Sequence, residues 1–259
     1  MNNIKRFLII AAICLSSLDA SAQKVRMHSH NDYFRTAPFY EAYSQKAESI
    51  ECDMYLVGNT FLVGHDRDKL TPERTFEELY LEPIIRVFRL NGGCAWKDEP
   101  ERPIQLMLDV KSADKQAFMK ALVKRLRRHR DVFDPSVNPH ACKVVITGYF
   151  PHEEGCSAYP DYIFYDYGRT EDELTQEQLS HVLMFSPCFR TFSKWDGKTP
   201  NPDLSAISEQ IARAHALGKP IRFWAVPDTR LAWETLRALG VDFTNTDSPA
   251  RCAVWAAGL

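Results

Sequence analysis

The sequence predicts a single-domain TIM (β/α)8 barrel, on three observations. Strand-like and helix-like segments alternate along the chain, eight principal strands can be distinguished, and the length of residues 23–259, the expected mature chain, suits one barrel. The predicted strands are residues 24–30, 49–57, 104–110, 143–150, 161–167, 181–187, 220–226 and 241–247. A doubly wound open sheet is the alternative that the same alternation allows.

The first half contains a predicted hairpin and one fully buried strand. Residues 49–57 (SIECDMYLV) are rich in strand-forming residues, and the Gly-Asn pair at 58–59, before the return segment 59–66, is a hairpin signal. Residues 104–112 (IQLMLDVKS) form a nearly continuous apolar run, which is typical of a strand buried on both faces of a parallel sheet.

Apolar residues at helical spacing mark the segments between the strands. The predicted helices are residues 37–47, 75–90, 115–130, 171–179, 203–218 and 228–240. Pro83 is expected to break or kink the second helix, and Thr170 with Glu173 is expected to form a capping box before the fourth. Gly240 is expected to end the last helix.

Residues 1–22 are predicted to be a secretory signal peptide. Two basic residues precede an apolar run at 7–15, and a small-residue cleavage site ends at Ala22. The apolar run is too short to span a bilayer as a mature helix, so no stable membrane anchor is expected. The mature chain is therefore expected to be a barrel of residues 23–259 that is exported to the periplasm or secreted.

Charge and cysteine content argue against some classes of function. With 32 basic and 34 acidic residues the chain is nearly neutral, so it is not expected to bind nucleic acid. Its one basic run, KRLRRHR at 124–130, is interpreted as the solvated face of a helix. Six cysteines lie beyond the signal peptide without a CxxC pair, which argues against a structural zinc cluster. Export would permit disulfides, whose pairing stays open, and Cys52 is interpreted as a buried apolar residue.

Polar residues gather where the predicted strands end, at the face of a TIM barrel that carries active sites. Because side chains alternate along a strand, His28 and His30 share one face of the first strand, and Glu51 and Asp53 share one face of the second. The full set of polar residues at these strand ends is His28, His30, Glu51, Asp53, His65, Asp66, Asp109, Lys111, Trp224 and Asp247.

These residue types suit metal-assisted cleavage of a phosphodiester. Three converging carboxylates, Glu51, Asp53 and Asp109, would form a hard oxygen site for Mg²⁺ or Ca²⁺. Lys111 beside them would neutralise an anionic phosphate, and two histidines would serve as general acid and general base. The alternative for each charged pair taken alone is a structural ion pair, because a charge in an apolar strand needs a partner.

The order of these motifs resembles the glycerophosphodiester phosphodiesterase and phospholipase-C-like phosphodiesterase superfamily. The motifs that carry the resemblance are His30, ECD at 51–53, GHD at 64–66, DVK at 109–111, FWAV at 223–226 and TDSP at 246–249. HSHNDY together with LVGHD is most similar to the branch of altered inheritance of mitochondria protein six and its bacterial relatives.

The resemblance implies a role for each residue of the site. His30 and His65 would be the acid–base pair, and Glu51, Asp53 and Asp109 would bind a divalent cation. Lys111 would contact the phosphate of a small-molecule phosphodiester, and Trp224 would form a wall for the leaving group. His28 is interpreted as a supporting neighbour of His30.

One departure from the superfamily pattern bears on the substrate. The main enzymes follow the first histidine with Arg-Gly, whereas residues 31–33 of this chain are Asn-Asp-Tyr. The phosphate contact of that arginine is therefore missing or replaced, with Asn31 as the replacement that the sequence offers. Specificity for glycerophosphodiesters stays open for this reason.

Two other functions compete with this interpretation. An HxH pair is also typical of barrel zinc hydrolases of the amidohydrolase or polymerase-and-histidinol-phosphatase type, but the later strand ends lack the further histidines that a site of three or four ligands needs. A non-catalytic ligand-binding barrel would be expected to lack an acid, a base or a ligand, whereas the full set is present.

Overall fold

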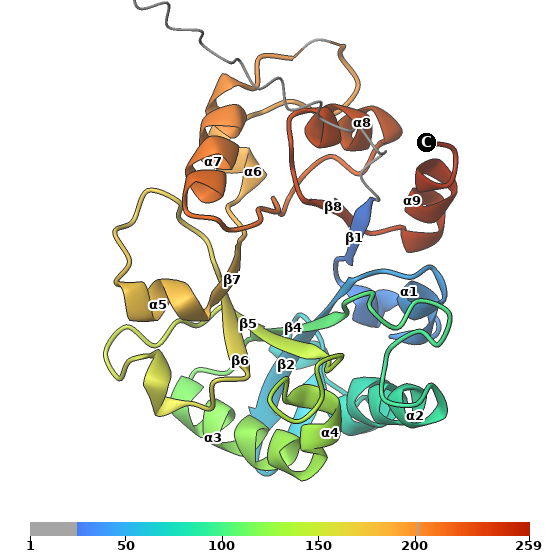
Figure 1. Cartoon of the computed structure of the whole chain (residues 1–259), viewed down its shortest axis with the longest axis vertical. Coiled ribbons are helices and arrows are strands. Elements are labelled where there is room, and N and C mark those ends of the chain that lie inside the picture. Colours follow the sequence, from blue (N-terminus) through green and yellow to red (C-terminus); the bar gives the residue numbers. More distant parts are fainter. Residues whose placement is uncertain (1–24, 201) are drawn as a thin grey trace, which may run out of the picture.

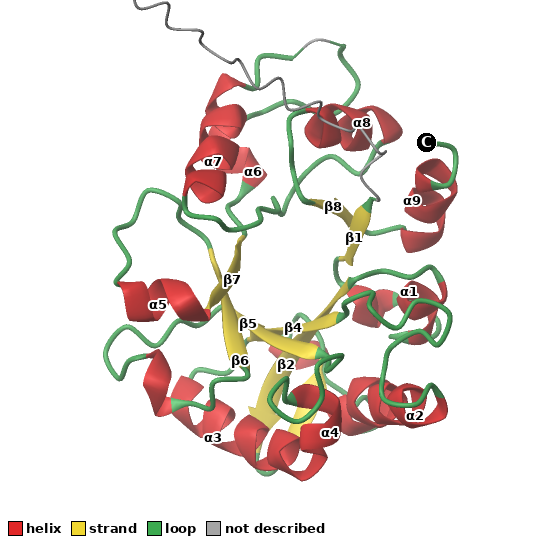
Figure 2. Cartoon of the chain, viewed as in Figure 1, coloured by secondary structure: helices red, strands yellow, loops and turns green. Residues whose placement is uncertain are grey.

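The structure, a computed structural model, describes residues 25–200 and 202–259. Its strands form one sheet in the order β7-β6-β5-β4-β2-β1-β8, and β3 pairs with β2 outside that order. The pairings along the order are parallel, and β3 is antiparallel to β2. The sheet is curled and the helices lie around its outside (Figure 1, Figure 2). The predicted signal peptide lies outside the described residues and stays a prediction.

The elements alternate along the chain largely as the sequence predicts. The strands are β1 (Arg26–Ser29), β2 (Ser49–Val57), β3 (Thr60–Val63), β4 (Gln105–Val110), β5 (Lys143–Thr147), β6 (Ile163–Tyr167), β7 (Val182–Phe185) and β8 (Phe243–Thr246). The helices are α1 (Tyr40–Ser44), α2 (Glu82–Leu90), α3 (Lys115–Leu126), α4 (Arg130–Phe133), α5 (Gln176–His181), α6 (Phe189–Phe192), α7 (Ser205–Ala216), α8 (Arg230–Ala238) and α9 (Pro249–Ala256).

Apolar side chains pack on both faces of the curled sheet. A small cluster of Met107, Val145, Met184 and Phe243 brings together side chains from β4, β5, β7 and β8, and two larger clusters include the apolar residues of the helices. Since side chains alternate, Asp109 faces the same side of β4 as Met107. On the concave side of the sheet, β4 therefore carries the apolar Met107 and, two residues further along, the carboxylate of Asp109.

The predicted strand at 220–226 is not a regular strand. Isolated bridges join Ile221 to Phe185 and Trp224 to Cys188, and the N–H of Asp242 donates to the carbonyl of Ile221 at 3.0 Å. Ala225 has a positive φ of 55°, which an extended strand does not accommodate. This segment therefore lies between β7 and β8 and is joined to them by only a few backbone contacts. The regular strands alone leave the curled sheet open at this place.

Helix boundaries show where local sequence signals were overridden. The helix predicted at 171–179 begins instead at Gln176, where Thr175 and Gln178 form the capping box. The predicted cap Thr170 is wrong, because its hydroxyl donates to the side chain of Gln210. The predicted effect of Pro83 is confirmed, since a π-helical turn (Glu77–Leu81) changes into α2 one residue before it.

Two further sequence-based expectations meet the structure. All six cysteines of the described chain are free thiols, and Cys52 is fully buried in β2 as an apolar residue. None of the helices in the described ranges has the length and apolar character that crossing a bilayer requires.

The position of the α5 cap can be tested by substitution. Thr175→Ala is expected to lower the free energy of unfolding by about 1 kcal/mol, because it leaves a backbone N–H of the first turn without its acceptor. Glu173→Ala, at the position that the sequence pattern suggested, is expected to change it by less than about 0.5 kcal/mol. Equal losses in urea denaturation would contradict the observed boundary.

Candidate active site

Three carboxylates converge at the end of two neighbouring strands. Glu51 and Asp53 lie two residues apart in β2, and Asp109 is paired with Asp53 in the parallel register of β2 and β4. One oxygen of each carboxylate lies within 4.8 Å of the others. Glu51 and Asp53 are buried and Asp109 is partly buried. The structure thus brings together the three carboxylates that the sequence singled out.

One oxygen of this cluster has no partner. Oδ2 of Asp53 accepts a hydrogen bond from the hydroxyl of Tyr33 at 2.9 Å, whereas Oδ1 is buried without a hydrogen-bond partner among the described residues. Burial and the charges of Asp109 and Glu51 raise the pKa of Asp53 to about 6. A buried carboxylate oxygen without a donor, beside two more carboxylates, fits the oxygen ligands that Mg²⁺ and Ca²⁺ prefer.

Lys111 adds a positive charge beside the carboxylates. Its Nζ lies 2.7 Å from Oδ2 of Asp109 and 3.2 Å from Oδ2 of Asp53, and its side chain is 24% exposed. Burial lowers the pKa of Lys111, but the two aspartates outweigh this effect and the pKa is raised. Lys111 therefore stays charged and within reach of solvent.

Gly148 packs closely against the carboxylate of Asp109. It has a φ of 70°, and a Cβ at this position would collide with Oδ1 of Asp109.

His30 is held by an aspartate from the other end of the chain. Its Nδ1 lies 2.8 Å from Oδ1 of Asp247, the residue that follows β8. Burial lowers the pKa of His30, but the hydrogen bond to Asp247 and the charge of Glu51 outweigh it, so the pKa is raised. Since Nδ1 is engaged, Nε2 is the ring nitrogen left to exchange a proton with a ligand.

The loop after His30 reaches back to the carboxylates. Asn31 has a left-handed backbone, with φ 50° and ψ 42°. Its Oδ1 accepts a hydrogen bond from the hydroxyl of Tyr33 at 2.7 Å, and its Nδ2 lies 3.1 Å from Nδ1 of His30. The Tyr33 hydroxyl is the same one that contacts Asp53. Asn31 therefore lies between the histidine and the carboxylate cluster.

A buried aspartate fixes the shape of this loop. Oδ1 of Asp32 accepts from the hydroxyl of Ser29 at 2.9 Å, and Oδ2 accepts from the N–H of Phe39 at 2.6 Å and the hydroxyl of Tyr80 at 3.0 Å. Because both carboxylate oxygens of Asp32 accept hydrogen bonds from other residues of the protein, Asp32 positions the loop. Asn31 and Tyr33 are the loop residues that contact the site.

His65 lies at the end of the β2–β3 hairpin. The N–H of Gly64 donates to the carbonyl of Asp53 at 3.0 Å, which places the start of this turn beside the carboxylate cluster. Nδ1 of His65 lies 2.8 Å from Oδ1 of Asp66, and the side chain is 56% exposed. The ring is oriented by its neighbour, but no direct side-chain contact joins it to the carboxylates within the described part of the chain.

Trp224, the predicted wall for a leaving group, lies in the segment between β7 and β8. Its N–H donates to the carbonyl of Pro187 at 3.3 Å, and its carbonyl accepts from the N–H of Phe189 at 2.9 Å. The residue is 44% exposed. The backbone is thus fixed while the indole stays available to a ligand.

His28 does not form a metal clamp with His30. Nδ1 of His28 lies 2.6 Å from the hydroxyl of Ser49, and Nε2 lies 2.7 Å from Oε2 of Glu51 and within hydrogen-bond distance of Arg222. Complete burial, with the nearby guanidinium of Arg222, lowers the pKa of His28 to about 3. A neutral ring with both nitrogens engaged supports Glu51 and is not free to bind zinc.

Arg222 is the central site residue that the sequence analysis missed. Its guanidinium is buried, lies 3.0 Å from Oε2 of Glu51 and 3.5 Å from Oδ2 of Asp166, and donates to Asn245 at 3.0 Å. Burial raises the pKa of Glu51, but the hydrogen bond with His28 and the charge of Arg222 outweigh it, so the pKa is lowered. The available signal was a lone charge within the apolar run PIRFWAV, the same signal that drew attention to Glu51 and Asp109.

Removal of Arg222 is expected to destabilise the protein strongly. Arg222→Leu leaves Glu51 buried without its cation, and such a loss costs roughly 3–5 kcal/mol of unfolding free energy. The matched control is Arg230→Leu, which removes an exposed ion pair with Glu234 and is expected to cost about 1 kcal/mol or less. Urea denaturation measures both, and similar costs would contradict a central role for Arg222.

The chain is similar to proteins of known families in sequence and in structure. Residues 16–166 match the model of the AIM6-like phosphodiesterase domain. The protein named altered inheritance of mitochondria protein 6 from Eremothecium gossypii is 30% identical over 86% of this chain and 67% of its own length. The homologue of that protein from Arthroderma benhamiae is 31% identical over 86% of this chain and 81% of its own length.

Solved structures show the same fold at low sequence identity. A glycerophosphodiester phosphodiesterase from Parabacteroides distasonis matches 91% of this chain and 97% of its own, with a TM-score of 0.52 and 17% identity. A protein named as a glycerophosphoryl diester phosphodiesterase, from Silicibacter pomeroyi, matches 90% of this chain and 93% of its own, with a TM-score of 0.55 and 14% identity. On the sequence matches, the chain belongs to the AIM6-like phosphodiesterase family and is a phosphoric diester hydrolase.

Proposed function

We propose that this protein is a metal-dependent phosphodiesterase that cleaves a glycerophosphodiester or a related small phosphodiester by acid–base catalysis with two histidines. The observation that carries the proposal is the buried cluster of Glu51, Asp53 and Asp109 with the unpartnered Oδ1 of Asp53. In this proposal the curled sheet is a TIM barrel that the segment 220–224 closes. The substrate class follows the names of the matched structures.

The three carboxylates would hold one divalent cation, Mg²⁺ or Ca²⁺. When bound, such an ion supplies Lewis acidity that polarises the phosphodiester and stabilises negative charge in the transition state. The protein's own contribution is to keep the ligands charged and in place. Arg222 and His28 fix Glu51, the Tyr33 hydroxyl holds Asp53, and Lys111 holds Asp109.

Lys111 would bind a phosphate oxygen as a second source of positive charge. Its ammonium already lies against two carboxylates, so it is held in place before a substrate arrives. A fixed cation stabilises the charge that develops on the phosphorus oxygens without reorganisation of solvent. Trp224, with its exposed indole, would pack against the leaving alcohol.

The two histidines share an arrangement that suits proton transfer. His30 and His65 each have Nδ1 close to an aspartate oxygen, Asp247 and Asp66 respectively, which leaves Nε2 for the substrate. One histidine would take the proton from the attacking hydroxyl, which belongs either to water or to the substrate itself. The other would give a proton to the leaving alkoxide, so that the protons balance over one turnover.

Removal of either histidine tests the acid–base assignment. His30→Ala and His65→Ala are each expected to lower kcat on a panel of phosphodiesters by about 100-fold or more. The control is His215→Ala, because His215 forms a similar pair with Asp242 but lies on the outer helix α7. Full turnover by His65→Ala would exclude that residue from catalysis.

Removal of divalent cations tests the metal. A chelator is expected to abolish turnover, and added Mg²⁺ or Ca²⁺ is expected to restore it, because the buried carboxylates repel an anionic substrate in the absence of a cation. In the Asp53→Asn variant, the concentration of Mg²⁺ or Ca²⁺ that restores half of the turnover is expected to rise by at least tenfold. Turnover that is indifferent to chelation would contradict the proposal.

The pH dependence of turnover tests the pairing of His30 with Asp247. Because the hydrogen bond to Asp247 raises the pKa of His30, Asp247→Asn is expected to move the limb of the kcat/KM profile that reports His30 to lower pH. The direction is the same whether His30 acts as acid or as base. Asp242→Asn, at the outer histidine pair, is expected to leave both limbs in place.

A further inference from the structure

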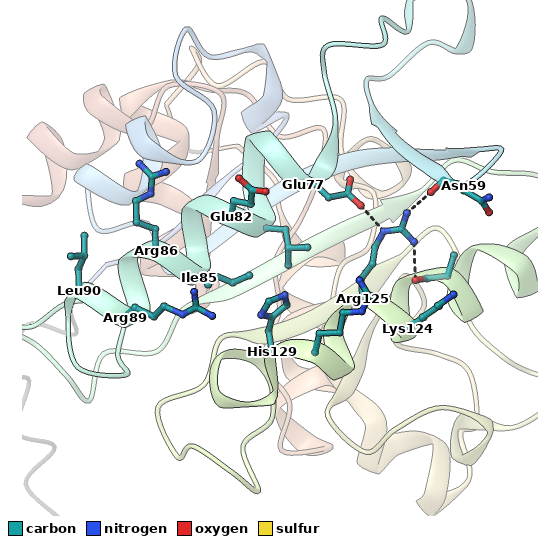
Figure 3. Close-up of a pocket in the computed structure, with 13 residues that line it drawn as sticks. Asn59, Glu77, Glu82, Ile85, Arg86, Arg89, Leu90, Lys124, Arg125 and His129 are labelled. Atoms are coloured by element: carbon teal, nitrogen blue, oxygen red, sulfur yellow. Dashed lines mark hydrogen bonds and ion pairs between the residues drawn. The ribbon is translucent and has the colours of Figure 1, made fainter.

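A basic groove lies between α2 and the end of α3, apart from the residues of the active site. It encloses about 950 Å³. Its cationic side chains come from two helical segments, Arg86 and Arg89 from α2, and Lys124, Arg125, Arg128 and His129 from α3 and the turn after it (Figure 3). The groove therefore uses part of the basic run at 124–130 that the sequence analysis interpreted as a solvated surface.

Most of the cations in the groove are not neutralised by the protein. Arg125 is paired with Glu77 and also donates to the backbone carbonyls of Ala121 and Asn59, so its charge is already compensated by the protein. Arg89, Lys124 and Arg128 have no ion pair or side-chain hydrogen bond within the described part of the chain, and Glu82 is the one acid of the lining besides Glu77. Like charges gathered in this way repel one another unless an anion lies between them.

His129 shows that the two sides of the groove face a common point. Its Nδ1 is buried without a hydrogen-bond partner among the described residues. Burial and the charge of Arg89 lower the pKa of His129, the charge of Asp131 raises it, and the charge of Arg128 lowers it again. Figure 3 shows Arg89 extending from α2 toward His129. An anion at this point would meet donors from both helical segments.

The remaining basic residues of the run do not belong to this groove. Arg127 and Arg130 line a different hollow, and Arg130 is paired with Asp134 at 2.8 Å. The cations are thus divided between two hollows and do not form the continuous basic face that a nucleic acid backbone would require. A recess lined by cations from two helical segments suits a compact ligand better than a flat membrane surface.

We propose that this groove binds a small soluble anion that carries two or more phosphate groups. Arg89, Arg128 and Lys124 supply charge-assisted hydrogen bonds to phosphate oxygens. The buried side chains of Leu81 and Ile85 lie in the lining, and an apolar surface nearby strengthens such contacts. The site is additional to the proposed phosphodiesterase reaction and does not depend on it.

Calorimetric titration with inositol hexakisphosphate as the probe tests the proposal. Arg89→Gln and Arg128→Gln are each expected to weaken binding by about tenfold, because each removes charge-assisted hydrogen bonds. The matched control is Arg127→Gln, which removes the same charge one position earlier and outside the groove, and is expected to change affinity by less than about twofold. Unchanged thermal unfolding of these variants would show that they fold.

Further measurements distinguish binding in the groove from binding elsewhere on the protein. Uncharged myo-inositol is expected not to bind, and Lys111→Gln, in the active site, is expected to bind the probe as the parent protein does. Equal weakening by Arg127→Gln, or loss of binding in Lys111→Gln, would overturn the proposal. Retention on anionic phosphatidylserine vesicles without binding of the soluble probe would also overturn it, in favour of a membrane surface. A failed phosphodiesterase assay would leave all these results standing.

Discussion

The site depends on how three carboxylates are kept charged inside a curled parallel sheet. Burying a carboxylate costs several kcal/mol unless a cation or hydrogen-bond donors compensate it. Arg222 compensates Glu51 from the segment between β7 and β8, and Lys111 compensates Asp53 and Asp109 from the end of β4. Two cations for three carboxylates leave a net negative charge, and Oδ1 of Asp53 is the oxygen left without a donor. The arrangement is thus stable enough to preform the site and still favours a bound cation.

The register of β2 and β4 fixes where the three carboxylates lie. The parallel pairing places Glu51 opposite Met107, at the level of the apolar cluster of Met107, Val145, Met184 and Phe243, and places Asp53 opposite Asp109 one residue pair further along the strands. A slip of one residue would turn the carboxylates outward and expose the apolar cluster. The same packing that fills the interior of the sheet therefore fixes the spacing of the carboxylate oxygens.

Sequence patterns predicted those parts of the site whose residues lie close together in the chain. The carboxylates and Lys111 follow from spacing within apolar strands, and their convergence follows from the parallel order of those strands. The partnership of Arg222 with Glu51 spans 171 positions, and no spacing rule within one strand predicts it. The segment 220–226 was misjudged for a related reason, since its apolar composition predicts a strand while Ala225 adopts a left-handed backbone. The cap of α5 was misplaced because the side chain of Thr170 is used for tertiary contact with Gln210.

The loop after His30 shows how the departure from the superfamily pattern is accommodated. Asn31 stands where an arginine would be expected, and its side-chain amide accepts a hydrogen bond from Tyr33 and lies beside the ring of His30. A guanidinium is nevertheless present beside His30, because Arg35 donates to the carbonyl of His30 at 3.2 Å. The pKa of Asp247 is lowered mainly by its hydrogen bond with His30 and by the charge of His30, and the charge of Arg35 lowers it further. Nε of Arg35 is buried without a partner among the described residues. Positive charge beside the histidine therefore comes from a residue four positions further along the chain, which sequence position alone does not reveal.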